Sequence, residues 1–387
     1  MARLGDVFEA QITGEWGNEC TENEAGTKVL RTTNFTSDGI INFDNVVLRS
    51  ITESKVEKKR LRYGDIILEK SGGTEKTPVG RVVFCDQSIE DDTYLCNNFT
   101  QAMRVNQEVG YPRYVFYFMW YLHYSGKTDL LQNKTTGIRN LQVKSYLNEE
   151  IPLPSLEEQR RIAALLDRVS DLIAKRRVQL DKLDLLVKAR FVEMFRAEEE
   201  RKTLSDICSI ITDGTHQPPK FVTEGIPFLF VSNVVSNVIT YETEKYISQE
   251  TYNELIKRTP IEPGDILLST VGSYGHPAIV KDKKKFLFQR HIAYLKPNHE
   301  MVYSEYLHSA LLSCDVQRQI EAKVKGVAQK TLNLSEIKKI SLPTPPMNTQ
   351  RKFCKFVEQV NGGKSIIEHS LDKLEILEKA LMQQYFG

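Results

Sequence analysis

Two Glu-x-Lys triplets and one glycine-rich stretch have the residue types that enzymes use on nucleic acids and nucleotides. The triplets, Glu57–Lys59 and Glu321–Lys323, have the composition of half a nuclease site, but neither has a carboxylate partner at a suitable spacing. The stretch SGGTEKT, residues 71–77, approaches a phosphate-binding loop and lacks its second glycine. None of these stretches completes a catalytic motif.

Histidines and prolines of the second half could suggest metal binding or base methylation. His216, His276 and His291 are only loosely near each other in the sequence and lack the spacing of a metal site. QPPK at 217–220 lacks the residues of an amino-methylation motif. We therefore expect no catalytic residues, no metal and no cofactor in this chain.

A short motif that occurs twice is the strongest feature of the sequence. Pro152, Pro154, Gln159 and Arg160 in IPLPSLEEQRRI recur in the same order and spacing as Pro343, Pro345, Gln350 and Arg351 in LPTPPMNTQRKF. The stretch LDKLDLLVKA at 180–189 likewise recurs as LDKLEILEKA at 371–380. Ordered matches of this quality indicate a duplicated unit of about half the chain.

Each unit combines a mixed segment with a long helix, so we predict an α/β protein of two tandem pseudo-repeats. Short β-rich runs follow the Gly-Asp turns at 64–65 and 264–265, and helical stretches follow at 112–124 and 303–313. The prolines then fix an extended approach to a long helix. The expected domains are 1–150 and 203–340, each globular, with helical regions at 151–202 and 341–387.

Apolar residues at a 4-3 spacing predict that the two long helices pair as an antiparallel coiled coil. In the first helix this seam comprises Ile162, Leu166, Val169, Ile173, Arg176, Leu180, Leu183 and Val187. In the second it comprises Phe353, Val357, Val360, Lys364, Ile367, Leu371, Leu374 and Leu381. We assume a register that places Arg176 opposite Ile367, and we expect a kink or fraying at Gly362-Gly363. The alternative is that each helix is buried separately in its own domain.

Composition and charge are those of an ordinary globular protein. The chain has 387 residues, 41% hydrophobic and 27% charged, with a net charge of +1. The longest apolar run, Tyr114–Leu122, is too short to span a bilayer, and the N-terminus lacks an apolar signal core. Six cysteines without a C-x-x-C pair favour reduced thiols, so we expect a cytoplasmic protein without membrane contact.

Taken together, these motifs resemble the DNA-specificity subunit of type I restriction-modification systems along essentially the whole chain. The resemblance rests on the half-length repeat, the P-x-P…Q-R motif, the K-A…F helix ends (Lys188-Ala189…Phe195 and Lys379-Ala380…Phe386) and D-G-T-H at 213–216. It also rests on the G-D-I-L turn and on S-G-G-T with the later V-G-R.

Several expectations follow from this resemblance. It implies two target recognition domains, held apart by antiparallel helices, that each recognise one half of a split, asymmetric site in double-stranded DNA. It also implies two methyltransferase subunits, which would use S-adenosylmethionine, and restriction (helicase-nuclease) subunits that join through the complex.

Under this resemblance, the DNA contacts should be polar or basic residues in glycine-containing loops, where backbone and side chains can reach bases. In the first unit the candidates are Arg31, Thr32, Asn34, Lys70, Ser71, Gly72, Gly73, Thr74, Arg81 and Arg139. In the second they are Thr212, Asp213, Gly214, Thr215, His216, Gln217, Ser232, Asn233, Ser269, Thr270, Gly272, Ser273, Tyr274, Gln289, Arg290 and Lys330.

Other interpretations of these residues stay open. Each candidate could instead be a turn residue or a solvated charge. The run Lys281–Lys285 could face phosphates, although a solvated hairpin tip is the favoured interpretation. The whole chain could instead be a coiled-coil scaffold or adaptor without DNA specificity.

Overall fold

The chain divides into two compact units that share both long helices. The computed structural model describes residues 1–21, 26–74, 77–133, 138–326 and 329–387. Unit 1 comprises Met1–Arg177 with His369–Gly387, and unit 2 comprises Val178–Glu368. Each unit therefore contains one globular segment and about half of each long helix. The domains expected from the sequence instead separate the globular segments from the helical regions.

Unit 1 is built around two small sheets. The first has the order β2 (Phe8–Thr13), β9 (Thr100–Val105), β5 (Ile66–Glu69) and β7 (Val82–Phe84). The second has the order β4 (Val47–Arg49), β3 (Thr27–Leu30) and β8 (Tyr94–Cys96). Smaller sheets are β10 (Gln132–Asn133), β11 (Arg139–Leu141) and β6 (Ser71–Gly73), and the pair β1 (Ala2–Arg3) and β12 (Glu150–Ile151). The helices are α1 (Glu53–Lys59), α2 (Pro112–Tyr124), α3 (Lys127–Leu130) and α4 (Val143–Leu147), with 3-10 turns η1 (Leu4–Val7), η2 (Thr32–Asn34) and η3 (Gln87–Glu90).

Unit 2 repeats the two main sheets strand for strand. Its four-stranded sheet has the order β14 (Cys208–Asp213), β20 (Ile292–Pro297), β17 (Ile266–Ser269) and β18 (Pro277–Ile279), and its three-stranded sheet β16 (Tyr246–Ile247), β15 (Ile226–Leu229) and β19 (Leu287–Phe288). The pair β13 (Arg201–Thr203) and β21 (Ser341–Pro343) completes the strands. The helices are α6 (Leu204–Ile207), α7 (Gln249–Leu255), α8 (Ser304–Leu311), α9 (Cys314–Lys323) and α10 (Leu334–Ile337), with 3-10 turns η4 (Val231–Asn233) and η5 (Ile256–Arg258). The predicted mixed α/β pseudo-repeat is confirmed.

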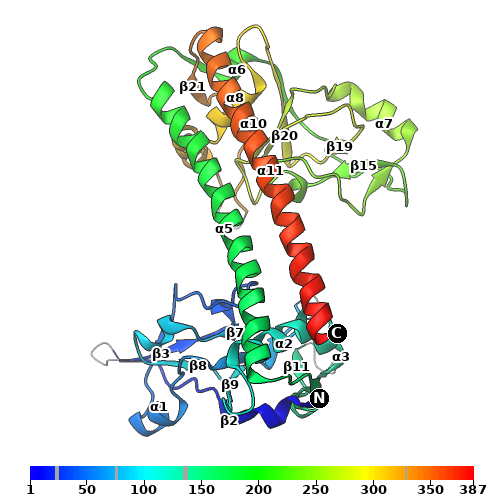
Figure 1. The fold of residues 1–387 in the computed structure, drawn as a ribbon. Helices are drawn as coiled ribbons and strands as arrows, with labels where there is room; N and C mark the ends of the chain where they lie inside the picture. Colours follow the sequence, from blue (N-terminus) through cyan, green and yellow to red (C-terminus); the bar gives the residue numbers. More distant parts are fainter. Residues whose placement is uncertain (22–25, 75–76, 134–137, 327–328) are drawn as a thin grey trace. The chain divides into compact units, whose positions relative to one another are not determined.

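Both long helices are continuous. They are α5 (Leu156–Phe195) and α11 (Met347–Phe386), the green and red helices of Figure 1. The fraying expected at Gly362-Gly363 is wrong, because α11 runs through both glycines. The buried neighbour Val360 and the ion pair of Lys364 with Asp184 (2.7 Å) hold this part of the helix and offset the low helix propensity of glycine. No helix in the described residues has the length and apolar character needed to cross a membrane.

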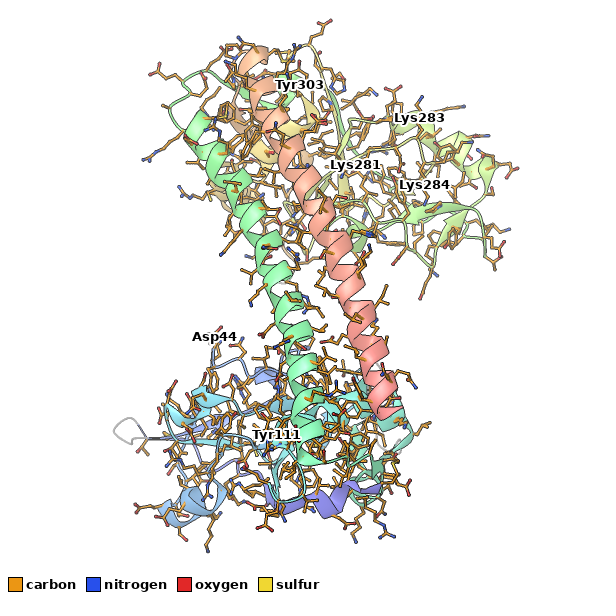
Figure 2. The ribbon with its side chains drawn as sticks, in the orientation of Figure 1. Asp44, Tyr111, Lys281, Lys283, Lys284 and Tyr303 are labelled. Carbon is orange, nitrogen blue, oxygen red and sulfur yellow. The ribbon has the colours of Figure 1, made fainter. Side chains whose placement is uncertain are left out.

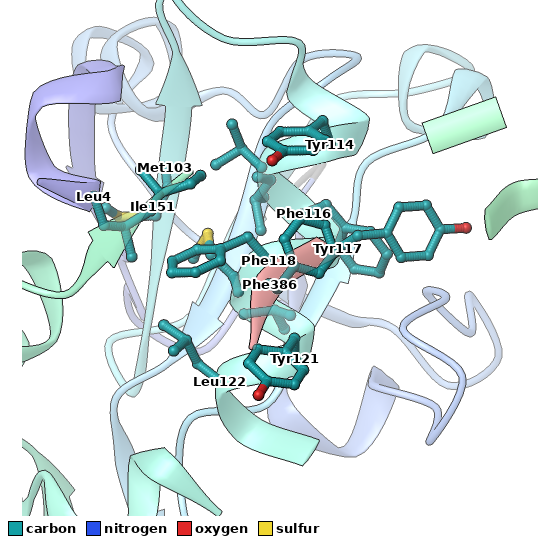
Figure 3. Packing of buried hydrophobic residues seen from close by; sticks show 14 of the residues in the cluster. Leu4, Met103, Tyr114, Phe116, Tyr117, Phe118, Tyr121, Leu122, Ile151 and Phe386 are labelled. Carbon is teal, nitrogen blue, oxygen red and sulfur yellow. The ribbon is translucent and has the colours of Figure 1, made fainter. Parts of the chain in front are cut away.

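In each unit the start of one long helix packs beside the end of the other. In unit 1 the core joins Ile162 and Leu166 of α5 with Met382 and Phe386 of α11. The ring of Phe386 lies 5.2 Å from that of Tyr114 on α2 (Figure 3). In unit 2 the corresponding cluster joins Phe191 and Phe195 of α5 with Phe353 of α11 and Tyr306 of α8. The paired helix segments therefore run antiparallel.

No member of the predicted seam is fully exposed. In α5 the residues Ile162, Leu166, Val169 and Ile173 are buried, and Arg176, Leu180, Leu183 and Val187 are half-buried. In α11 the residues Phe353, Val357 and Val360 are buried, and Lys364, Ile367, Leu371, Leu374 and Leu381 are half-buried.

The assumed helix register is wrong. Within unit 1 the hydroxyl of Ser170 donates to Glu378 at 2.7 Å. Because the helices are antiparallel, a step of six residues forward from Ser170 in α5 corresponds to a step of six residues back from Glu378 in α11. Arg176 therefore lies opposite Asp372 and not opposite Ile367. The 4-3 pattern alone is compatible with several registers, because successive seam layers look alike.

The repeated glutamine explains the duplicated motif. Gln159 is 1% exposed; its Oε1 accepts from the N–H of Tyr111 (2.8 Å), and its Nε2 donates to the carbonyls of Pro154 (2.9 Å) and Val109 (3.3 Å). The amide thus ties the start of α5 to the start of α2, whose first N–H groups lack helical partners.

Gln350 makes the same set of bonds in unit 2. Its Oε1 accepts from Tyr303 (3.2 Å), and its Nε2 donates to Pro345 (2.9 Å) and Met301 (3.0 Å). The following arginines, Arg160 and Arg351, lie over the rings of Tyr111 and Tyr303, which Figure 2 labels. The motif therefore fastens each globular segment to its long helix.

We expect Gln159→Leu to destabilise unit 1 by about 2–4 kcal/mol, because leucine keeps the volume but leaves buried polar backbone groups unpaired. Hydrogen exchange followed by mass spectrometry should show faster exchange in α2 and at the start of α5. Gln350→Leu is the matched control and should instead loosen α8 and the start of α11. Hydrogen-exchange rates equal to those of the wild type in both variants would contradict this fastening role of the two glutamines.

Candidate nucleic-acid interface

Arg81 is held by a buried carboxylate beside η2. Its Nε and Nη2 donate to the two oxygens of Glu69, each at 2.8 Å, and Nη2 also reaches the carbonyl of Thr32 at 3.3 Å. The side chain of Glu69 is 6% exposed and that of Arg81 38%. These hydrogen bonds raise the pKa of Arg81, so the guanidinium stays charged. The structure therefore places the candidates Thr32 and Arg81 together.

A second group of unit 1 candidates surrounds strand β6. Strand pairing places Arg139 opposite Gly73, although they are far apart in the sequence. Gly72 is exposed with φ 98°, and nothing lies within 4 Å of the position its Cβ would take. Backbone in this loop is therefore open to close approach by a ligand. The neighbouring candidates are Lys70 and Ser71, both half-buried, and the exposed Thr74; Glu75 and Lys76 of the glycine-rich stretch lie outside the described residues.

Asn34 and Asn233 have the same internal role in the two units. Asn34 is 2% exposed; its Oδ1 accepts from the N–H of Arg31, and its Nδ2 donates to the carbonyls of Asn42 and Asp44. Asn233 is 5% exposed, and its amide bonds the backbone of Phe230 and Glu242 in the same way. Both amides are used within their own loops, so these residues support the loops from inside.

Two other candidates of these turns, Arg31 and Ser232, differ in exposure. Arg31 is half-buried, and its Nη2 donates to the carbonyl of Asn45 at 2.9 Å. Ser232 is exposed at the surface of η4. Ser232 is therefore the candidate of η4 whose side chain is open to a ligand.

In unit 2 the loop after β17 pairs with the segment around Lys330. The N–H of Gly272 donates to the carbonyl of Lys330 at 3.1 Å. The Nζ of Lys330 pairs with Glu321 at 3.2 Å, and the hydroxyl of Tyr274 donates to Glu321 at 2.7 Å. This arrangement corresponds to β6 with Arg139 in unit 1. Of the remaining candidates in the loop, Ser269 and Thr270 are buried and Ser273 is exposed.

The D-G-T-H stretch lies beside Gln289 and Arg290. The N–H of Arg290 donates to the carbonyl of Thr215 at 3.0 Å, and Thr215 forms an isolated parallel β-bridge with Gln289. A Cβ on Gly214 would lie 2.3 Å from the carbonyl oxygen of Phe288, so only glycine permits this close packing. Thr212 is half-buried in β14, and Gln217 is exposed and lines a groove with His216.

An arginine absent from the sequence-based set joins this group. Arg258 of η5 pairs with Asp213 and lies 3.1 Å from Nε2 of His216. Asp213 also contacts His216 at 3.0 Å. Nothing in the local sequence around Arg258 indicates this position, because the contact depends on how η5 packs against the end of β14.

The Gly-Asp turns before β5 and β17 have a structural role. Asp65 and Asp265 are each 1% exposed and accept from the backbone N–H groups of Arg62 (2.9 Å) and Glu262 (2.7 Å). Burial raises the pKa of Asp265, and the hydroxyl of Tyr294, 2.7 Å away, opposes this shift by donating to the carboxylate.

The lysine run Lys281–Lys285 forms an exposed connection from β18 to β19 (Figure 2 labels Lys281, Lys283 and Lys284). Lys284 lies over the ring of Tyr241 at 4.2 Å. The corresponding connection of unit 1, from β7 to β8, instead carries Asp86, Glu90, Asp91 and Asp92. Opposite charge at one position of the fold distinguishes the two units.

The possible enzyme residues have other partners. Glu321 pairs with Lys330, and Lys59 pairs with Glu15 at 2.8 Å. In the described part of the chain, no group of three or more His, Cys, Asp or Glu side chains is arranged to hold a metal ion. What the two units do offer is hydrogen-bond donors and cations on glycine-containing loops, which suits contact with nucleic acid.

Known proteins share this sequence pattern and fold. The family described as Type I restriction modification DNA specificity domain matches residues 1–182 and 198–376. The type I restriction enzyme EcoBI specificity subunit of Escherichia coli is 24% identical over 64% of this chain and 60% of its own length. The MjaVIII specificity subunit of Methanocaldococcus jannaschii is 24% identical over 65% of this chain and 64% of its own length. The chain thus spans less than two thirds of the length of these two relatives.

A solved structure supports the same fold. The type I restriction-modification S subunit from M. genitalium covers 100% of this chain and 95% of its own, with a TM-score of 0.53 and 15% identity. The family match covers nearly the whole chain in two blocks, one for each pseudo-repeat. The chain belongs to the family of type I restriction-modification DNA specificity subunits.

Proposed function

We propose that this chain is the non-catalytic subunit that gives a type I restriction-modification complex its DNA sequence specificity. The globular segment of each unit is a recognition domain for one half of a bipartite, asymmetric DNA site. Two methyltransferase subunits dock on the helices and supply S-adenosylmethionine chemistry, and restriction subunits join through them.

One observation carries this proposal: the two units have the same loop framework and different polar side chains on it. Arg139 of unit 1 and Lys330 of unit 2 flank equivalent glycine-containing loops, after β5 and β17. A common backbone with different donors and acceptors is what two readers of different half-sites require. A scaffold without DNA specificity gives no reason for this difference.

A duplicated apolar surface supports the docking of two identical partners. Leu185 and Leu186 of α5 are 62% and 46% exposed, and their repeat equivalents in α11, Ile376 and Leu377, are 66% and 45% exposed. Exposed apolar pairs on otherwise polar helices mark protein contacts. Their recurrence at equivalent positions provides one such surface in each unit.

The test is a DNA-binding titration of the chain alone and of the chain with its methyltransferase subunits, at several salt concentrations. With a net charge of +1, the chain alone should bind weakly and with a shallow salt dependence. Addition of the methyltransferase should give sequence-dependent binding at least about 10³-fold tighter than binding to unrelated DNA. Equal affinity and salt slope without the partner would contradict the proposal.

Variants of the apolar pairs provide the control for partner docking. Leu185→Asp and Ile376→Asp should each remove one methyltransferase from the complex, as measured by native mass spectrometry. Leu130→Asp changes an 84% exposed leucine of α3 and should leave the stoichiometry unchanged. Loss of both partners with Leu130→Asp would show that the effect is not specific to the helices.

A further inference from the structure

Glu69 and Arg81 of unit 1 occupy the same backbone positions as Ser269 and His276 of unit 2. In unit 1 the N–H of Glu69 donates to the carbonyl of Arg81 at 2.9 Å; in unit 2 the N–H of Ser269 donates to the carbonyl of His276 at 3.1 Å. The glycine before each basic residue has a positive φ, 107° and 82°, and donates to the carbonyl of residue 69 or 269. One loop framework thus presents two different side-chain pairs.

The carboxylate of Glu69 fixes one edge of the Arg81 guanidinium and leaves the other open. Nε and Nη2 are bound to Glu69, and Nη2 makes one further hydrogen bond, to the carbonyl of Thr32. The guanidinium carbon also lies 5.8 Å from the centre of the Phe35 ring. Within the described residues, Nη1 donates to no protein group. A buried ion pair contributes little net stability, whereas a carboxylate that orients a guanidinium prepares its free edge for a ligand.

His276 has a fixed backbone and an unengaged ring. Its N–H donates to the hydroxyl of Ser269 at 3.0 Å, and within the described residues its ring nitrogens make no hydrogen bond to the protein. The residue is half-buried, and a serine is too short to orient the ring as Glu69 orients Arg81. The second unit therefore offers a donor at the same place without a carboxylate behind it.

We propose that Arg81 and His276 are equivalent DNA contacts of the two recognition domains, and that Glu69 is a positioning residue that acts through Arg81. This assignment rests on the proposed function. The ligand is a hydrogen-bond acceptor of DNA, either a phosphate oxygen or the O6 and N7 edge of guanine. Each half-site would meet an equivalent strand-end position, with a charged fork in one domain and an imidazole in the other.

The experiment uses the complex with its methyltransferase subunits and four variants: Arg81→Gln, Glu69→Gln, both together, and Glu69→Ser/Arg81→His. The last transfers the unit 2 pair onto the equivalent backbone positions of unit 1. Binding is measured to the target, and to targets with single base changes, at several salt concentrations. Hydrogen exchange of unit 1 shows whether each variant is folded.

We expect Arg81→Gln to weaken binding about tenfold and Glu69→Gln to weaken it less, while the double variant is no weaker than Arg81→Gln alone. Uniform weakening with a salt slope smaller by about 1 identifies a phosphate contact. Relaxed discrimination at one base of the first half-site identifies guanine. If the Glu69–Arg81 ion pair were purely structural, the variants would change the hydrogen-exchange rates of unit 1. The salt slope and the base discrimination would then stay unaltered.

His276→Gln is the parallel variant in unit 2 and should affect the second half-site only. If folded variants bind like the wild type while the wild-type complex recognises its target, the assignment is overturned and the proposed function stands. A wild-type complex without sequence-dependent binding would overturn both.

Discussion

Exchanging residues 203–339 for the corresponding segment of another member of this family is expected to change one half of the methylated sequence and to leave the other half unaltered. The physical reason is that the core of unit 2 takes its candidate DNA-contact loops from this segment and its framework from α5 and α11. Methylation of the old second half-site should fall by about 10³-fold or more, the usual ratio between specific and non-specific sites.

The donor segment must retain the contacts that fasten it to the helices. Tyr306 packs against Phe191, Phe195 and Phe353, and the backbone of Tyr303 bonds Gln350. A donor segment with tyrosine at the position of Tyr306 keeps the aromatic packing against the two long helices. Methylome sequencing of cells that carry the hybrid is the measurement, and exchange of residues 1–150 is the reciprocal control. Change of both halves by either exchange would show that the domains do not read independently.

The duplicated framework could be predicted from the sequence because its signals are local and periodic. Pro152, Pro154 and Gln159 recur as a motif, and the seam from Ile162 onward follows a 4-3 pattern. The function of Gln159 could not be predicted, because its partner Tyr111 lies far back in the chain. The helix register could not be predicted for a related reason. It depends on side chains of both helices, and the seam pattern of each helix repeats from layer to layer.

The sequence alone says less about the candidate site than about the framework. Asn34 and Asn233 are polar residues of turns, as the candidate contacts are expected to be, yet both amides bond their own loops. Polar residues at turns often bond local backbone, and sequence alone does not separate this role from ligand contact. The equivalence of Arg81 and His276 is visible only in the strand pairing of the structure, because the loops that precede them differ in length.

A fragment of residues 1–202 is expected to form a stable homodimer that recognises an inverted repeat of the first half-site. In the full chain, Met382 and Phe386 of α11 complete the core of unit 1. Their repeat equivalents in α5 are Phe191 and Phe195, so a second copy of the fragment can supply two apolar side chains to the same sites. Without them, the cluster around Tyr114 and Phe118 would be open to water, which strongly favours association.

The corrected register decides which charges meet in this dimer. With the assumed register, Arg176 would have faced its own copy, and the dimer would have been weak and strengthened by Arg176→Ile. In the observed register the pair Arg177–Glu375 (2.9 Å) becomes Arg177 against Asp184 of the other copy, because Asp184 is the repeat equivalent of Glu375. Arg176 then lies opposite Asp181, so Arg176→Ile should give no gain in association.

Charge exchange tests this register directly in the fragment. Arg177→Glu places like charges together twice in each dimer and also removes the ion pair of Arg177 with Asp38 (2.7 Å) within each copy, so it should weaken association about tenfold or more. Arg177→Glu/Asp184→Arg should recover the part of this loss that comes from the pair between the copies, because that pair is then reversed. Phe195→Ala should weaken the dimer most, since it removes a large aromatic side chain from each core. Sedimentation equilibrium of the fragment and its variants is the measurement. A fragment that stays monomeric at high concentration, or a reversed pair that fails to recover, would show that the two copies do not pair as α5 and α11 do.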